Sequence, residues 1–231
     1  MPGRPTLYGY PISHYCVSAE RMLAFKGISF DPIYVPYSDK RELIRATGQD
    51  YVPALTWDGK VVTWEGIADF LEDAKPLPTL YPGGARGLAR TLENWGHQVL
   101  EERVWRYVVT RVPPLFTDEV ERWAFEEIQT RTRGPWALLE HRRPEFRVDM
   151  EKHLQYVEEM LEGRDWILEA PSLADFGLFG SLSPLLTVGE EIPPRFKHTR
   201  AWAGRIQQLG SVPREWGRGA SSVKPVSAGA E

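Results

Sequence analysis

The sequence has little cysteine, no long apolar run and no large excess of charge of either sign. Its single cysteine, Cys16, excludes a disulfide within the chain and a cysteine zinc site. No stretch approaches the ~18 consecutive apolar residues of a membrane span. A net charge of −4 at pH 7 argues against a general affinity for nucleic acid. We therefore expect no membrane, no nucleic acid and no metal as partners.

The remaining composition is that of an ordinary globular chain. Of 231 residues, 42% are apolar and 26% are charged, which excludes wholesale disorder and allows one large domain or two small ones. Residues 1–5 lack the apolar core of a signal peptide, so the expected location is the cytoplasm.

Residues 1–75 alternate between strand and helix patterns. Pro11 ends a strand at 6–10, because proline has no amide hydrogen to donate to a sheet. Asp58-Gly59 is typical of a two-residue hairpin turn. The other expected elements are a helix from about Cys16 to Lys26, a strand at 30–35, a helix at 39–46, strands at 54–57 and 60–62, and a helix at 63–74 capped by Thr63. This order predicts a thioredoxin-like α/β domain.

A second domain follows a short linker. Residues 76–84 are too rich in proline and glycine for a helix or a central strand. Beyond them the pattern is helical throughout, which predicts an all-α helical bundle at 85–209. Its expected helices lie at about 85–111, 118–141, 145–162, 172–187 and 196–208, and Ser172–Asp175 resembles a capping box. The composition of 210–231 predicts a disordered tail.

Ser13 lies where the first strand ends and the first helix begins. Unpaired amides and the helix dipole make such a position favourable for an anion, so a ligand thiol held there could ionise near neutral pH. Lowering a thiol pKa from ~8.5 to ~6.5 takes about 2.7 kcal/mol. One charge-assisted hydrogen bond supplies about 1.5–3 kcal/mol and the helix about 0.3–1 kcal/mol, so neither a metal nor a histidine base is required for this shift. The alternative interpretation is that Ser13 only caps the helix.

Two further features adjoin Ser13. Cys16 stands three residues later, giving Ser-x-x-Cys without the exposed thiol that dithiol exchange needs, which favours a buried, inert thiol. Val52-Pro53 leaves the Val52 amide and carbonyl free at a strand start, where an extended peptide-like ligand could pair.

Together these residues resemble the glutathione S-transferase superfamily. The similarity spans residues 6–209 and is carried by Leu7-Tyr8-Gly9, Pro11, Ser13, the Val52–Leu55 run, the Asp58-Gly59 turn, Ile67–Leu71 and the capping box at Ser172–Asp175. The resemblance implies a cytosolic, serine-type, bacterial-like member that forms a homodimer and serves in detoxification. It also implies that Ser13 activates the thiol of glutathione, the co-substrate, and that the Val52 backbone binds the cysteinyl unit before a cis Pro53.

The sequence departs from the family where the third helix begins. The family has a Glu/Asp-Ser pair there, which binds the γ-glutamyl carboxylate. An ungapped alignment places Thr63-Trp64 at the pair. Sliding the motif to Trp64-Glu65 implies a short deletion and leaves Gly66 where the serine should be, so neither alignment supplies the serine. Thr63, Trp64 and Glu65 are therefore the candidates for that end of glutathione. Lys40 is the candidate for the glycyl carboxylate, the alternative being a solvated lysine.

Several residues of the second domain have both a binding and a structural interpretation. Five aromatic residues could line a pocket for a small hydrophobic electrophile or belong to the core: Trp95, Trp105, Tyr107, Trp123 and Trp136. A basic cluster could meet an anionic partner or form a solvated turn: Arg131, Arg133, His141, Arg142, Arg143 and Arg147. Tyr10, His14 and Tyr15 lie near Ser13 as further possible contributors.

Three functions remain open. The first is a glutathione transferase that forms a thiolate and conjugates it to an electrophile or reduces a peroxide with it. The second is a non-catalytic module of the same architecture that binds ligands or proteins. The third is redox exchange through Cys16, which would require that thiol to react in the native state.

Overall fold

The N-terminal part of the chain is built on a four-stranded mixed sheet. The computed structural model describes residues 3–210. Its strands are β1 (Thr6–Gly9), β2 (Asp31–Tyr34), β3 (Ala54–Trp57) and β4 (Lys60–Thr63). Their order across the sheet is β2-β1-β3-β4, with β1 parallel to β2 and antiparallel to β3. The β3–β4 hairpin turns at Asp58-Gly59, both in the left-handed region with φ of 49° and 77°.

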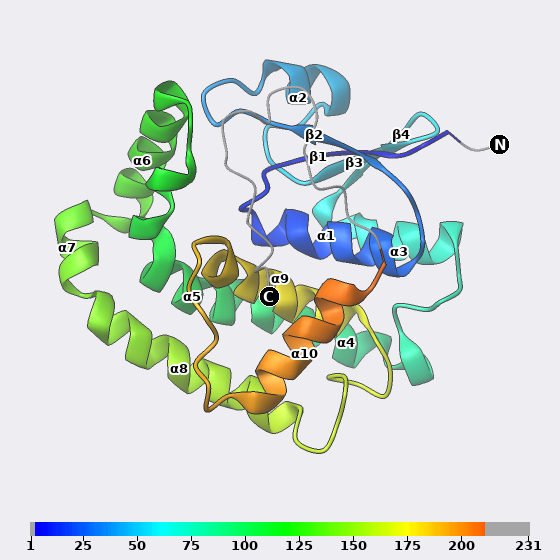
Figure 1. Ribbon diagram of the computed structural model, residues 1–231. Coiled ribbons are helices and arrows are strands. Elements are labelled where there is room, and N and C mark those ends of the chain that lie inside the picture. Colours follow the sequence, from blue (N-terminus) through cyan, green and yellow to red (C-terminus); the bar gives the residue numbers. More distant parts are fainter. Residues whose placement is uncertain (1–2, 211–231) are drawn as a thin grey trace.

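Three helices pack on this sheet. They are α1 (His14–Phe25), α2 (Arg41–Thr47) and α3 (Trp64–Ala74). In Figure 1, α1 and α3 lie between the sheet and the helical region, whereas α2 lies on the other side of the sheet. The arrangement is thioredoxin-like, as the sequence predicts.

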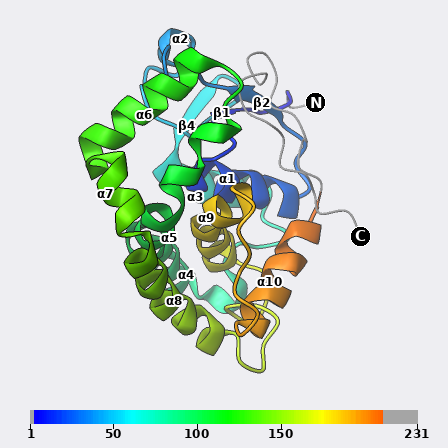
Figure 2. The ribbon, with the colours of Figure 1, turned by 60° about the vertical axis from the view of Figure 1, so that its left-hand side comes forward.

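The C-terminal region is entirely helical in the part of the chain that the structure describes. Its α-helices are α4 (Arg86–Trp95), α5 (Glu101–Val108), α6 (Glu119–Arg133), α7 (Trp136–His141), α8 (Arg143–Met160), α9 (Leu173–Thr187) and α10 (Lys197–Gln208). Helix α9 is buried along most of its length and packs against α1, α4, α5 and α10. Helices α6, α7 and α8 form an outer wall beside it (Figure 2).

Helix α9 begins at the predicted capping box. The Ser172 amide and hydroxyl both donate to Asp175 Oδ2, at 3.0 and 2.6 Å. The other Asp175 oxygen accepts from the Ile167 amide at 2.9 Å and from the Trp202 indole at 2.8 Å. This buried carboxylate therefore joins the start of α9 to the loop before it and to α10.

Two predicted helix boundaries are wrong, and the segment predicted as helical at 85–111 is helical from 86 to 111 but contains a π turn. The expected helix at 85–111 is interrupted by a π turn at Gly96–Leu100, where a Cβ on Gly96 would lie 3.0 Å from a Leu178 methyl of α9. The expected helix at 118–141 divides at Gly134, whose φ of 101° is followed by Pro135. Helix α1 begins at His14 instead of Cys16, because Ser13 is its N-cap.

Close contact between α1 and α9 fixes the start of α1. Gly180 of α9 faces the His14 carbonyl oxygen, which a Cβ at position 180 would approach to 2.5 Å. No side chain fits in that space, so the two helices can approach this closely only where α9 has glycine. The residues at the first turn of α1 are thereby set against the helical region.

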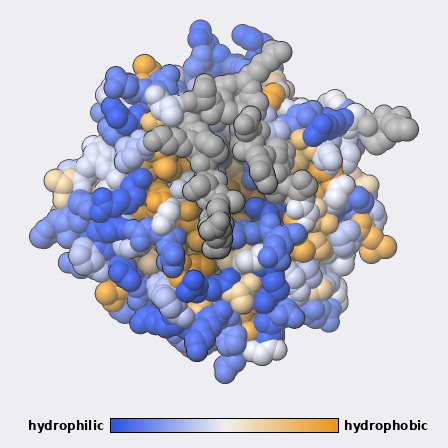
Figure 3. All heavy atoms as spheres, in the orientation of Figure 1, coloured by the Kyte–Doolittle hydropathy of each residue, from blue (hydrophilic) through white to orange (hydrophobic). Residues whose placement is uncertain are grey.

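The face of the molecule shown in Figure 3 is largely polar where described residues form it. Hydrophilic residues cover most of the face shown in Figure 3.

Four arginines of the basic cluster pair with glutamates, namely Arg133 with Glu102, Arg142 with Glu145, Arg143 with Glu190 and Arg147 with Glu151, which favours the structural interpretation of the cluster. Within 3–210 no helix is long and apolar enough to cross a membrane. The domain limits 1–75 and 85–209 stay predictions, and the tail prediction falls on residues outside the described range.

Candidate functional site

Ser13 occupies the N-cap of α1 and is half-buried. Its backbone is extended, with φ of −81° and ψ of 122°, and its hydroxyl oxygen accepts from the Cys16 amide at 3.4 Å. That amide uses one acceptor site on the oxygen, and the hydroxyl hydrogen remains to be donated. Ser13 therefore caps the helix, and capping leaves its hydroxyl able to donate to a ligand.

Cys16 lies behind Ser13 in the core. Its side chain is fully buried, and its sulfur accepts from the Tyr10 amide at 3.4 Å. Burial raises the pKa of the thiol to about 12, although hydrogen bonds from Ser13 and the Tyr10 amide oppose that rise. The thiol is neutral at physiological pH and out of contact with solvent. This is the inert cysteine that the sequence favours.

Ser13 opens into a cleft of about 280 Å³ between the sheet and helices α5 and α6. We call it the Ser13 cleft. It is lined by Tyr10, Ile12, Ser13, His14, Tyr37, Lys40, Tyr51, Val52, Glu101, Trp105, Gln129 and Arg133. Three predicted site residues, Ser13, Val52 and Lys40, thus line one cleft. The Val52-Pro53 peptide bond is cis, as expected, and the Lys40 ammonium donates to the Asp50 carbonyl at 2.6 Å.

Glu121 of α6 fixes the segment that precedes Lys40. Its carboxylate accepts from the Tyr37 amide at 2.6 Å, from the Ser38 amide and the Tyr34 hydroxyl at 3.2 Å, and from the Ser38 hydroxyl. The carboxylate is buried, and Tyr37 stacks on Tyr10 with centroids 4.1 Å apart. The sequence analysis missed Glu121, because nothing in its local pattern indicates that α6 reaches the segment after β2.

Trp64 and Glu65 line a different space. This second cavity, of about 310 Å³, is the Trp64 cavity and is lined by Tyr15, Trp64, Glu65, Ala68, Arg90, Glu93, Asn94, His97 and Gln98. The rings of Tyr15 and Trp64 have centroids 4.8 Å apart. Thr63 precedes α3, as predicted, but its hydroxyl donates to Glu65 at 3.0 Å and caps no amide.

A cluster of buried titratable residues lies between the two spaces. His14 Nδ1 is 3.4 Å from a Glu101 carboxylate oxygen, and the rings of His14 and His97 have centroids 5.0 Å apart. Burial raises the pKa of Glu101 to about 7 and lowers that of His97 to about 3. Burial, with smaller contributions from His97 and Arg133, also lowers the pKa of His14. The sequence analysis named His14 as a possible contributor but missed Glu101 and His97, because the three residues come from α1, α5 and the π turn.

The N-terminal part of the chain matches a known family. Residues 7–84 match the model described as glutathione S-transferase, N-terminal domain. This match covers about a third of the chain and assigns residues 7–84 to that domain type. No curated protein compared with the whole sequence matches it. The serine-type and bacterial-like subclass stays a prediction.

Solved structures extend the similarity in fold to the whole chain. A glutathione S-transferase from Rhodospirillum rubrum F11 superposes with a TM-score of 0.72 at 19% identity, covering 96% of each chain. FzlA from C. crescentus gives a TM-score of 0.69 at 21% identity, covering 89% of this chain and 88% of its own. The beta-etherase LigF from Sphingobium sp. strain SYK-6 gives 0.64 at 21% identity, covering 95% and 97%. These likenesses show the superfamily fold.

In this glutathione S-transferase-like chain the five predicted pocket aromatics lie apart. Trp105 lines the Ser13 cleft and donates its indole N–H to Gln129 at 2.9 Å. Tyr107 bonds to Glu190, Trp95 packs on Tyr156, and Trp136 packs on Phe125. Trp123 is 64% exposed on α6. Trp105 is therefore the member of this set that is placed to touch a ligand in the Ser13 cleft.

Proposed function

We propose that this chain binds glutathione and holds its thiol as a thiolate, which is then conjugated to an electrophile or used to reduce a peroxide. The observation that carries the proposal is the Ser13 hydroxyl at the N-cap of α1, in the same cleft as the Val52 backbone. The hydroxyl hydrogen bonds to the sulfur anion, and the N-terminus of α1 adds its favourable electrostatic potential.

The neutral Cys16 thiol is a weak competitor for the Ser13 hydroxyl. A thiol sulfur is a poor hydrogen-bond acceptor, and the raised pKa of Cys16 keeps it protonated. A ligand thiolate is a charged acceptor and forms the stronger bond. The Ser13 hydroxyl therefore exchanges a weak hydrogen bond to the neutral Cys16 thiol for a stronger one to the ligand thiolate.

The other site residues bind the remaining parts of glutathione. The Val52 backbone pairs with the cysteinyl unit, and the Lys40 ammonium, which keeps two N–H groups beyond its bond to Asp50, binds the glycyl carboxylate. Thr63, Trp64 and Glu65 at the start of α3 stay the candidates for the γ-glutamyl end, although Trp64 and Glu65 line the separate Trp64 cavity. Trp105 and Tyr37 contribute apolar surface for a small hydrophobic electrophile. The homodimer, the cytoplasmic location and a role in detoxification stay predictions.

A titration with glutathione tests the proposal. The ultraviolet absorption of thiolate is followed near pH 7 as glutathione is added, and retention on immobilised glutathione is measured in parallel. We expect a saturable rise in absorption beyond that of free glutathione. Saturable binding without any rise would mean that the thiol stays protonated, which contradicts activation by Ser13.

A non-catalytic binding module is the second candidate. It is favoured by Trp64, a large ring at a position where the superfamily places a serine that binds the γ-glutamyl carboxylate. This candidate predicts no retention on glutathione and no thiolate absorption. The same titration therefore separates the two functions.

A further inference from the structure

His14 and Glu101 face each other in the wall of the Ser13 cleft. His14 Nδ1 lies 3.4 Å from Glu101 Oε1, and the two side chains are 15% and 10% exposed. His14 directly follows Ser13, and Glu101 is the first residue of α5. The pair therefore stands beside the hydroxyl that the proposed function assigns to the glutathione sulfur.

Neither group is used up by a structural partner. Within the described residues, His14 Nε2 has no hydrogen-bond partner, and His14 is the one basic group within 4 Å of Glu101. Other charged or titratable groups act on Glu101 from further away: Tyr15 of α1, Arg133 of α6 and Glu102 of α5 itself. His97 of the π turn packs on His14, with ring centroids 5.0 Å apart. Burial raises the pKa of Glu101, Glu102 raises it further, and Arg133 opposes the rise, leaving it at about 7.

Forming a thiolate requires an acceptor for the thiol proton. Ser13 is not that acceptor, because its hydroxyl must keep its hydrogen to donate it to sulfur. The tyrosines Tyr10 and Tyr37 have raised pKa values and are poor acceptors as phenols. Burial lowers the pKa of His14, which makes its imidazole a weaker base than Glu101. Among the described residues that line the cleft, Glu101 is the one carboxylate.

Building on the proposed function, we propose that the Glu101 carboxylate accepts the proton that the glutathione thiol loses in the Ser13 cleft. The S–H bond breaks, its electron pair stays on sulfur, and an O–H bond forms on Glu101. His14 is a positioning residue that holds Glu101 toward the cleft. After sulfur has bonded to the electrophile, Glu101 returns the proton to the leaving group or to water. A general base works best when its pKa is near the operating pH, which Glu101 satisfies.

Proton release on binding tests this assignment. Calorimetry of glutathione binding in two buffers of different ionisation enthalpy gives the number of protons released, and thiolate absorption gives the thiolate formed in the same samples. At pH 8 about three-quarters of free thiol is protonated, if its pKa is ~8.5. The thiolate charge beside Glu101 raises the pKa of this carboxyl in the complex, so Glu101 keeps the proton and we expect almost no proton release in the wild type. We expect about 0.75 proton per thiolate in E101Q. E101D restores the wild-type result, and E140Q, which changes an exposed carboxylate on α7, leaves it unchanged.

The wild type provides a second test that needs no variant. Below pH 7 Glu101 is already protonated in the free protein, so release per thiolate should rise from near zero at pH 8 to near one at pH 6. Without a protein base, release stays above ~0.7 throughout. Equal release by wild type and E101Q at pH 8, or a flat wild-type profile, overturns the role of Glu101 and leaves that of Ser13 intact. Absence of thiolate in the wild type refutes the proposed function itself and this assignment with it.

Discussion

Trp64 packs against Tyr15 at the first turn of α3, with ring centroids 4.8 Å apart and ring planes inclined at 54°. His97 meets the edge of the same indole, with centroids 4.9 Å apart. Three aromatic rings thus cover the helix start at which the superfamily places a serine. Under the ungapped alignment Trp64 stands at the serine position, so we expect an apolar contact in place of a hydrogen bond and a lower affinity for the γ-glutamyl end of glutathione.

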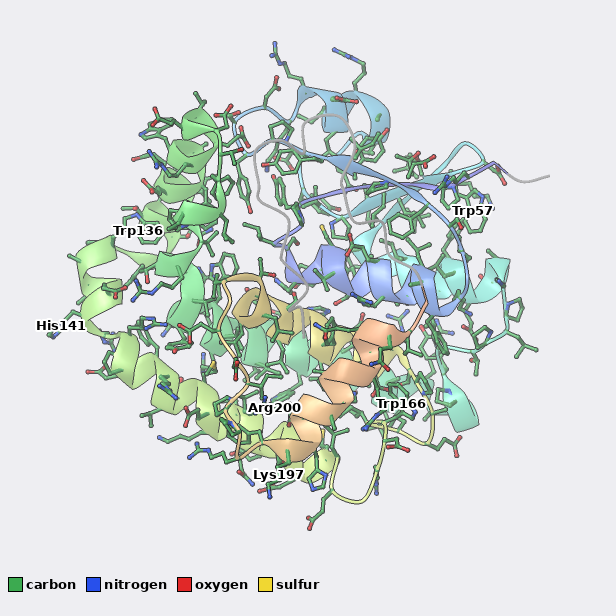
Figure 4. All side chains as sticks on the ribbon, viewed as in Figure 1. Trp57, Trp136, His141, Trp166, Lys197 and Arg200 are labelled. Atoms are coloured by element: carbon green, nitrogen blue, oxygen red, sulfur yellow. The ribbon has the colours of Figure 1, made fainter. Side chains whose placement is uncertain are left out.

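Replacing Trp64 with serine should strengthen glutathione binding about tenfold. A hydroxyl at this position can donate to the γ-glutamyl carboxylate. A hydrogen bond to a charged group contributes at least about 1.5 kcal/mol of binding free energy, which corresponds to a tenfold change in Kd. Loss of the half-buried ring should lower the free energy of unfolding by about 2 kcal/mol. Calorimetry measures the affinity. Trp57→Ser is the control, since Trp57 lies on β3 and lines neither cavity (Figure 4). Unchanged or weaker binding by folded Trp64→Ser would show that the helix start does not contact glutathione.

Glu121→Gln should destabilise the protein by about 3 kcal/mol. The carboxylate accepts from two amides and two hydroxyls, and a neutral amide replaces one acceptor oxygen with an N–H₂ group that faces donors. Denaturant unfolding measures the loss. Glu119→Gln, two residues earlier and 89% exposed in its side chain, should change stability by less than ~0.5 kcal/mol. Similar small effects for both variants would mean that Glu121 does not hold the Tyr37–Ser38 segment.

His97→Phe should reduce the loss of stability in acid. The pKa of His97 is lowered to about 3 in the folded protein, so between pH 6.5 and 3 the unfolded chain binds a proton that the folded chain does not. This costs folding on the order of 3 kcal/mol at pH 4. Phenylalanine keeps the ring contacts and cannot bind a proton, so this free-energy cost disappears. Unfolding free energies at pH 7 and pH 4 should therefore differ less in the variant than in the wild type.

His141→Phe is the matched control for this pH effect. His141 is exposed on α7 and points away from the molecule (Figure 4). Its substitution should leave the difference between pH 7 and pH 4 as in the wild type. A His97→Phe profile that matches the His141→Phe profile would refute burial of a neutral imidazole.

Cys16 should resist alkylation in the native protein. The side chain has no exposed surface and its pKa is raised to about 12, so iodoacetamide at pH 7.5 should not react until the chain is unfolded. Mass spectrometry before and after denaturation checks this. Rapid modification of the folded protein would instead favour redox exchange through Cys16.

Local signals predicted much of the fold. The Asp58-Gly59 turn, the capping box at Ser172–Asp175 and the proline-ended first strand are short-range features, and the structure has all three. The π turn at Gly96–Leu100 was not predictable in this way, because its glycine is required by the approach of Leu178 from another helix. The division at Gly134-Pro135 did have a sequence signal, since proline after glycine ends a helix.

The candidate site was predictable where a local sequence signal marks a residue. Ser13 and Val52 were found because each ends or begins a strand, and the structure places both in one cleft. Glu101, His97 and Glu121 could not be found, because their significance comes from contacts between segments that are about 80 or more residues apart. The catalytic role of Ser13 and the binding role of Val52 stay predictions.

The thiolate pKa of bound glutathione is the most direct test of the role of Ser13. Thiolate absorption of the saturated complex is titrated from pH 5 to pH 10 for the wild type, Ser13→Ala and the control Ser18→Ala, whose hydroxyl bonds to the His14 carbonyl. We expect a midpoint near ~6.5 for the wild type and Ser18→Ala, and one near ~8.5 for Ser13→Ala, with turnover reduced roughly 10²-fold, about 2.7 kcal/mol. The same midpoint in the wild type and Ser13→Ala would contradict activation of glutathione by Ser13.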